Sequence, residues 1–122
     1  TVALDGAILG KPENVDDAKR ILRMLSGQTH RVFTAIAIGW GAQTVQACSE
    51  SQVTFALMTE DDIASYVASG EPMGKAGGYG VQGRAAAFIE RISGSYSGIM
   101  GLPLFETAQA LRAVGFACNK TF

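Results

Sequence analysis

The stretches THRVFTAIAIGW (residues 29–40) and QTVQACSESQVTFAL (residues 43–57) decide the fold that this sequence predicts. The first is apolar on both of its faces, which is typical of a central strand. The second alternates apolar and polar residues, which indicates a strand with one face in water. A turn at residues 39–43 joins the two. We therefore predict that they pair as one long hairpin.

The residues before this hairpin predict a second, shorter hairpin followed by a helix. Asp5-Gly6 is a strong turn signal between two short apolar runs, residues 1–4 and 7–9. Asn14 is a good N-cap, and Ser26-Gly27 is a good helix end. Between them, apolar residues recur at intervals of three and four and predict one buried stripe, formed by Val15, Ala18, Ile21, Leu22 and Leu25.

The residues after the long hairpin predict further helices and loops. Thr59 and Asp62 are spaced as a helix start, so the acidic residues 60–62 suit the positive end of a helix rather than a metal. Residues 85–92 fit either a strand or a helix, and a last helix follows Pro103 and ends at Gly115. Its expected inner face is Leu104, Ala108 and Leu111. Alternating strands and helices predict the α/β class.

Composition narrows the possible functions of the chain. Its 122 residues suit one domain, and a net charge of -1 without a basic run argues against binding duplex DNA or RNA. No apolar run approaches the roughly 20 residues of a membrane span, so we expect a cytoplasmic protein without membrane contact. Cys48 and Cys118 fit no metal or redox spacing and are expected to be buried or half-buried thiols. His30, the only histidine, offers little basis for a zinc site or a catalytic triad.

A glycine-rich stretch, GEPMGKAGGYGVQG (residues 70–83), is the candidate binding element. Free backbone N–H groups together with the Lys75 ammonium suit phosphate, and the Gln82 amide suits a base edge or a ribose. The stretch is one residue short of a P-loop, and Ala76 stands where Ser or Thr is required. It also lacks the strand before it that a dinucleotide fingerprint needs. A flexible structural loop remains the alternative on composition alone.

Several motifs together give the chain a family resemblance. They are TV (residues 1–2), ILGKP (8–12), LSGQTH (25–30), GEP (70–72), KAGGYGVQG (75–83), ISGSYS (92–97) and GLPL (101–104). In this order and approximate spacing the chain resembles the Maf family, first described as septum formation inhibitors. The family's members are house-cleaning nucleoside triphosphate pyrophosphatases. The form of residues 75–83 is similar to the branch that acts on dTTP and UTP.

This resemblance implies a hydrolase that uses a divalent metal, Mg²⁺ or Mn²⁺, to cleave a nucleoside triphosphate into the monophosphate and pyrophosphate. It implies that Lys11 and Lys75 hold phosphates and are the catalytic candidates. Gln82 would contact the nucleotide, and Thr1 belongs to the family's Asp-Thr-Val motif, so both are candidate nucleotide-binding residues. No residue is assigned as a metal ligand.

The chain also departs from the family pattern. The family's Ser-x-Ser-Pro-Arg-Arg loop, a glutamate and the aspartate before Thr1 are missing, and Gly74 stands where many members have aspartate. We therefore expect residues 1–122 to be a single Maf-like α/β domain, with the mixed sheet flanked by helices that the resemblance implies, that lacks the N-terminal part of the fold. The rival hypothesis is a catalytically incomplete nucleotide-binding or regulatory fragment. An apolar patch and an unpaired strand edge would then favour a homodimer or larger self-association.

Overall fold

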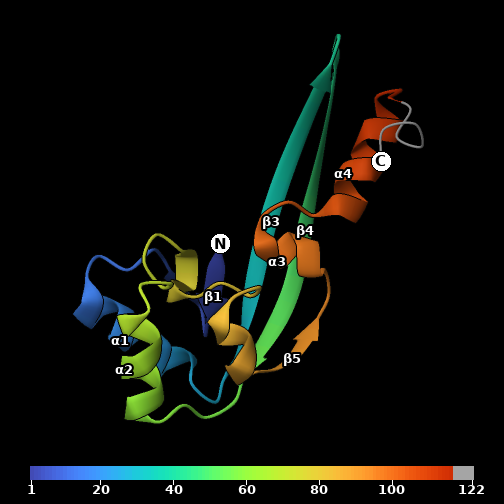
Figure 1. Ribbon diagram of the computed structural model, residues 1–122. Coiled ribbons are helices and arrows are strands. Elements are labelled where there is room, and N and C mark those ends of the chain that lie inside the picture. The colour runs from blue at the N-terminus through green and yellow to red at the C-terminus, as the bar shows by residue number, and fades with distance from the viewer. Residues whose placement is uncertain (117–122) are drawn as a thin grey trace.

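The computed structural model describes residues 1–116, in which strands and helices are combined as predicted. The strands form one sheet in the order β2-β1-β3-β4-β5, drawn as arrows in Figure 1. We predicted a mixed sheet, whereas every pairing among the described residues is antiparallel. The alternation of elements in the sequence indicates their type but leaves the strand directions open. The strands are β1 (Val2–Leu4), β2 (Ala7–Leu9), β3 (Thr29–Trp40), β4 (Gln43–Phe55) and β5 (Ile89–Ser93).

The long hairpin formed by β3 and β4 is confirmed. Its register runs without a break from Thr29 opposite Thr54 to Trp40 opposite Gln43. A two-residue turn closes it, and Gly41 in this turn has a φ of 62°, a left-handed conformation that glycine adopts without a steric cost. The first hairpin, β1 with β2, is also confirmed, with Asp5 and Gly6 at its turn.

Four helices accompany the sheet in the described part of the chain. They are α1 (Val15–Leu25), α2 (Glu60–Ala68), α3 (Tyr96–Met100) and α4 (Leu104–Ala113). Two short 3₁₀ turns, η1 (Ala76–Gly78) and η2 (Arg84–Phe88), lie within and just after the glycine-rich stretch. The ambiguous residues 85–92 are divided between η2 and β5. No helix among the described residues is long and apolar enough to cross a membrane.

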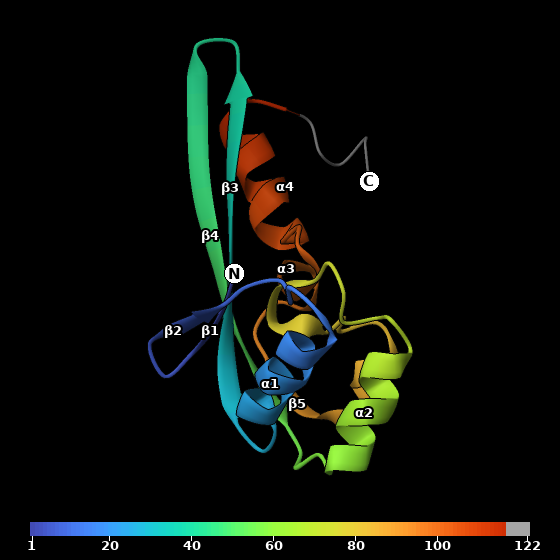
Figure 2. The same ribbon diagram turned by 90° about the vertical axis from the view of Figure 1, so that its left-hand side faces the viewer.

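The molecule has two unlike parts, seen in Figure 2. The first, which we call the base, comprises β1, β2, α1, α2, the glycine-rich stretch and the open end of the long hairpin. Its core includes Leu22 and Val53, both with no exposed surface, and Phe55, which is 1% exposed. The second, which we call the arm, comprises residues 35–48 of the hairpin together with α4. None of residues 35–48 is buried, although β3 is apolar on both faces there.

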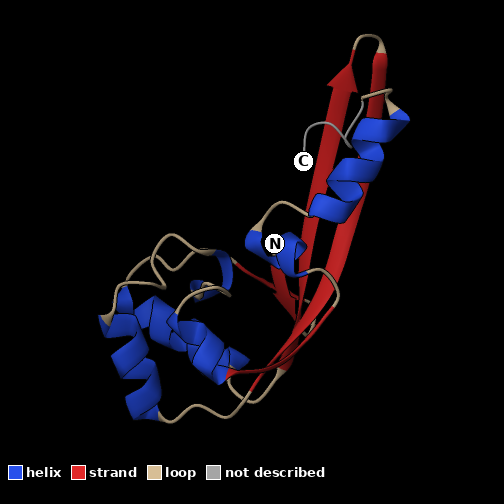
Figure 3. Ribbon diagram, turned by 45° about the vertical axis from the view of Figure 1, so that its right-hand side comes forward, coloured by secondary structure: helices blue, strands red, loops and turns tan. Residues whose placement is uncertain are grey.

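The arm is covered on one side by α4, which runs along the two long strands in Figure 3. Ala110 and Val114 are its buried contacts, not the predicted Leu104, which is 53% exposed. Pro103 caps the helix without a side-chain hydrogen bond, and Gly115 ends it as predicted, with a φ of 96°. The predicted stripe of α1 is confirmed at its buried residues, but Val15, in the first turn, is 52% exposed.

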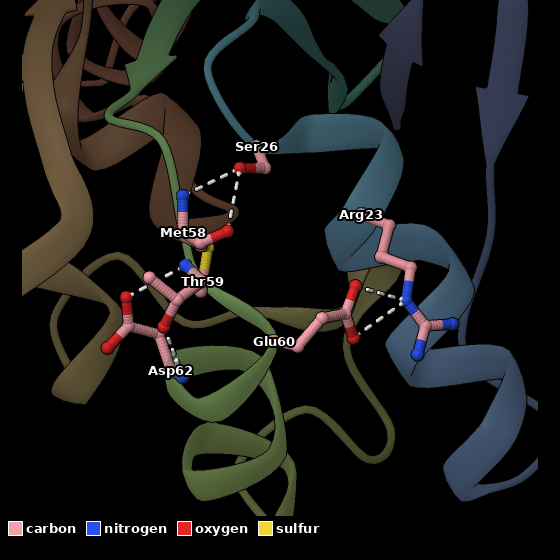
Figure 4. Close-up of polar contacts among 6 residues, drawn as sticks. All are labelled: Arg23, Ser26, Met58, Thr59, Glu60 and Asp62. Atoms are coloured by element: carbon pink, nitrogen blue, oxygen red, sulfur yellow. Dashed lines mark hydrogen bonds and ion pairs between the residues drawn. The ribbon is translucent and has the colours of Figure 1, made fainter.

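The contact between α1 and α2 explains the acidic residues at the start of α2, as shown in Figure 4. Asp62 and Thr59 form a reciprocal capping box, with hydrogen bonds of 2.9 and 3.0 Å. Glu60 accepts two hydrogen bonds from Nε of Arg23 at 2.9 and 3.0 Å, and this contact lowers the pKa of its carboxyl. Ser26, which ends α1, accepts a hydrogen bond from the Met58 backbone N–H at 2.7 Å. These residues serve the fold, in agreement with the sequence.

Candidate functional site

A cavity of about 270 Å³ lies where β1, β3, the glycine-rich stretch and α3 meet. Three of the four predicted site residues, Thr1, Lys75 and Gln82, line it. The rest of the wall mixes apolar side chains with backbone and two further hydroxyl groups, those of Thr34 and Tyr79: Val2, Val32, Thr34, Ala76, Tyr79, Gly80, Val81, Ile99, Met100 and Gly101. The cavity is therefore lined by one cation, one amide and three hydroxyl side chains.

Lys11 is the predicted site residue that does not line this cavity. It is exposed, in the connection between β2 and α1. The backbone beside it is nevertheless joined to the glycine-rich stretch, because the Gly77 N–H donates to the Gly10 carbonyl at 3.1 Å. The structure thus brings Lys75, Gln82 and Thr1 together on one wall and leaves Lys11 outside it.

Lys75 is held in place by the stretch that precedes it. Its Nζ donates to the Glu71 carbonyl oxygen at 2.9 Å, and the side chain is half-buried. An ammonium group has three donors, so two remain for a ligand after this bond. Thr1 is fixed from the sheet, because its carbonyl oxygen accepts the Phe33 N–H at 2.8 Å.

Glu71 shapes the end of the glycine-rich stretch, a role that sequence reasoning missed. Its carboxylate oxygens accept the Arg84 N–H at 3.1 and 3.0 Å. The carboxylate also occupies the space that a Cβ of residue 83 would need, so Gly83 cannot be replaced without displacing it. Its place in the Gly-Glu-Pro motif, so close to Lys75, was the only available signal. Glu71 does not line the cavity.

The short helix α3 forms the opposite wall, and the sequence did not predict it. Ser51 of β4 accepts the Ser95 N–H at 2.8 Å, and Ser95 in turn caps α3 by accepting the Gly98 N–H at 3.0 Å. Thr34 of β3 donates to the Gly98 carbonyl at 2.7 Å. Hydroxyl groups therefore attach α3 to the long hairpin and place Ile99 and Met100 on the cavity.

His30 lies behind the cavity wall and contacts Tyr79, which lines the cavity. The His30 Nε2 and the Tyr79 hydroxyl are 2.6 Å apart, and the Tyr79 ring meets Phe55 edge to face with centroids at 4.9 Å. Burial lowers the pKa of His30 to about 4, so the ring is neutral at neutral pH, and burial raises the pKa of Tyr79. His30 Nδ1 has no hydrogen-bond partner among the described residues. The histidine is thus a core residue.

The residues present do not fit a metal site. No group of three or more His, Cys, Asp or Glu side chains that could hold an ion occurs among residues 1–116. The cavity lining contains no carboxylate, and Gly74 supplies none. We therefore assign no metal ligand and derive no step through a metal. Cys48, expected to be buried or half-buried, is exposed on β4 instead, because it has the outward parity of that strand, whereas Cys118 lies outside the described residues.

Comparisons with known proteins agree with the motifs. A family model described as "Maf-like protein" matches residues 1–114. The chain is 65% identical over 115 residues to the dTTP/UTP pyrophosphatase of Polaromonas sp. (strain JS666), covering 94% of this chain and 57% of that protein. It is 62% identical over 112 residues to the Ralstonia nicotianae dTTP/UTP pyrophosphatase, covering 91% of this chain and 54% of the relative. The chain thus spans little more than half the length of these relatives. It belongs to the Maf family.

Proposed function

We propose that the protein represented by this chain is a nucleoside triphosphate pyrophosphatase that hydrolyses dTTP and UTP to the monophosphate and pyrophosphate. The observation that carries the proposal is the cavity where Lys75, Gln82 and Thr1 meet. Its support is the identity of 57–65% to relatives that are named dTTP/UTP pyrophosphatases. An enzyme that removes nucleotides from the cellular pool would act in the cytoplasm.

Each lining residue has a role that its chemistry suits. The two free donors of Lys75 would neutralise phosphate oxygens, and the backbone N–H groups of residues 81 and 82 would add uncharged donors beside them. Gln82, which presents both a donor and an acceptor, would read the pyrimidine edge or hold the ribose. The Thr1 hydroxyl would contact the nucleotide from the sheet side. Lys11, outside the cavity, would reach only phosphates that extend beyond it.

The test is pyrophosphate release from dTTP and UTP with Mg²⁺ or Mn²⁺, in parallel for the chain and for Lys75→Met. We expect release by the wild-type protein and a loss of at least about tenfold with Lys75→Met, because one charge-assisted phosphate contact is removed. Lys19→Met, in α1 and outside the cavity lining, is the matched control and should leave the rate unchanged. Equal rates for Lys75→Met and wild type would contradict the role of Lys75.

A second candidate function follows from the absence of carboxylates in the cavity wall of the described part. In this second candidate function, residues 1–122 by themselves bind a nucleotide without turning it over, because hydrolysis requires a group that orients or deprotonates water. Calorimetric titration with dTTP separates the two functions. Binding without pyrophosphate release would identify a nucleotide-binding unit, whereas release above the blank would identify a complete active site.

We also propose that the chain self-associates. Large apolar side chains are exposed on the arm and around α3, among them Trp40 at 57% and Phe105 at 69%. Burial of apolar surface of this kind drives association. Light scattering should give a mass of at least two chains, and a monomer at micromolar concentration would contradict the proposal.

A further inference from the structure

We propose that His30 is a positioning residue for the cavity. Through its hydrogen bond to the Tyr79 hydroxyl, it holds the glycine-rich stretch against β3 and so places residues 80–82 on the cavity wall. The inference rests on the proposed function for the identity of the ligand, while its geometry stands without it. It assigns a role to a buried imidazole that the proposed chemistry does not use.

The contact joins the stretch to the sheet at the right place. His30 is 1% exposed and Tyr79 is 6% exposed, and their polar atoms are 2.6 Å apart. Tyr79 lines the cavity, and the three residues that follow it, Gly80, Val81 and Gln82, line it as well. A shift of the tyrosine would therefore be transmitted along the backbone directly to the ligand-facing residues.

The stretch needs such an anchor because its own backbone is permissive. Gly77 has a φ of 73° and lies in the turn just before the tyrosine, so the chain there has little intrinsic preference for one conformation. A second hydrogen bond holds the stretch from the side of α2, because the Gly80 N–H donates to the Tyr66 hydroxyl at 3.3 Å. Side chains from β3 and α2 thus hold neighbouring residues of the stretch.

Stability alone does not explain a histidine at this position. The ring is buried with Nδ1 unpartnered among the described residues, and an unpaired buried polar atom costs free energy. An apolar residue opposite a phenylalanine would fill the same space without that cost. The hydrogen bond between His30 and Tyr79 instead fixes the orientation of the tyrosine side chain, which apolar contact does not do.

The experiment measures backbone amide hydrogen exchange at residues 80–83, relative to Leu22 in α1, and the affinity for dTTP. The variants are Tyr79→Phe and His30→Leu, which each remove one partner, and the double variant, which removes both. His30→Gln keeps a side-chain amide within reach of the tyrosine. Ile63→Val is the control, because it trims a buried side chain of α2 that belongs to the same core without touching the bond.

We expect Tyr79→Phe and His30→Leu to accelerate exchange at residues 80–83 by about tenfold relative to Leu22, the size expected for one lost hydrogen bond. The double variant should keep the fast exchange even if its thermal stability recovers. His30→Gln should restore exchange to within about twofold of wild type, and Ile63→Val should not change the ratio. Affinity for dTTP should fall only in the variants that show fast exchange.

Two results would overturn the inference. In the first, residues 80–83 and Leu22 accelerate by the same factor, as they also would in Ile63→Val, which would mark a general loss of stability. In the second, the double variant regains both stability and wild-type exchange, which would show that the bond has no positioning role. A wild-type chain that binds no dTTP would contradict the proposed function instead, and the exchange ratios would still decide the role of His30.

Discussion

The base and the arm contain similar apolar residues but differ in how deeply these residues are buried. In the base, alternate residues of β4 reach the core, as Val53 and Phe55 do, and they belong to one core cluster with the buried residues of α1. In the arm the same strand continues with Val45 and Ala47 on the same face, and neither is buried. The difference is the cover: two helices and the glycine-rich stretch pack on the base, whereas α4 alone lies along the arm. Strand sequence predicts a face that can be buried, but other elements decide whether it is.

The cavity lies on the base side of this division, where the wall is held by buried groups. Tyr79 lines the cavity, and its ring meets the stacked rings of His30 and Phe55 edge to face. The arm is held chiefly by strand pairing and by the small contacts of Ala110 and Val114. We therefore expect changes in the base to affect both stability and ligand binding, and changes in the arm to affect mainly association.

The largest effect should come from the same kind of truncation made in each part. Leu22→Ala in the base removes a side chain with no exposed surface and leaves a cavity, so it should lower the free energy of unfolding by about 4 kcal/mol. Ile38→Ala in the arm trims a half-buried side chain and should cost about 1 kcal/mol. Urea denaturation of both variants measures the difference. Equal losses would show that the arm is as tightly packed as the base.

The next largest effect should come from low pH, which should lower the stability of the part that we call the base, through His30. Its pKa falls from the ordinary 6.5 to about 4 on folding because the ring is buried, so the unfolded chain binds the proton more strongly. Stability is therefore unaffected above pH 6.5 and decreases as the pH falls from 6.5 to about 4. The linked loss is about 3 kcal/mol over that window.

The chain has one histidine, so the part of this window above about pH 5, where carboxylates stay ionised, reports on His30 alone. Unfolding free energies measured at intervals from pH 7 to 4 should decrease for the wild type and stay nearly level for His30→Gln down to pH 5. The same slope in both proteins would show that His30 is accessible to protons in the folded state.

The smallest difference in stability between the base and the arm should come from replacing one glycine in each part by alanine. Gly77 in the base and Gly41 in the arm both have positive φ, of 73° and 62°. Alanine in that backbone conformation costs about 1 kcal/mol of stability at either position. At residue 77 its Cβ would also lie 3.1 Å from the Val2 side chain, whereas at residue 41 no atom lies within 4 Å. We expect losses of about 2 and 1 kcal/mol in thermal denaturation. A Gly41→Ala variant that loses more than Gly77→Ala would reverse the comparison.

The sequence predicted local structure well and packing less well. Asn14, Thr59 and the Asp5-Gly6 turn act through neighbours in the chain, so their roles could be read directly. The burial of Leu104 and Val15 was predicted wrongly, because periodicity marks a face without showing what covers it. At the site, the grouping of Lys75, Gln82 and Thr1 agrees with the motifs. The roles of Glu71, Tyr79 and α3 depend on contacts between residues far apart in sequence, which no local pattern contains.

The most direct test of the central claim is a titration of the chain with dTTP, followed by the backbone amide chemical shifts in NMR. If the cavity of the base is the nucleotide site, the largest shifts should occur at Gly80, Gln82 and Gly101, and the turn of the arm at Gly41 should not respond. Shifts that are largest in the arm, or no shifts in the cavity wall at millimolar nucleotide, would contradict the account.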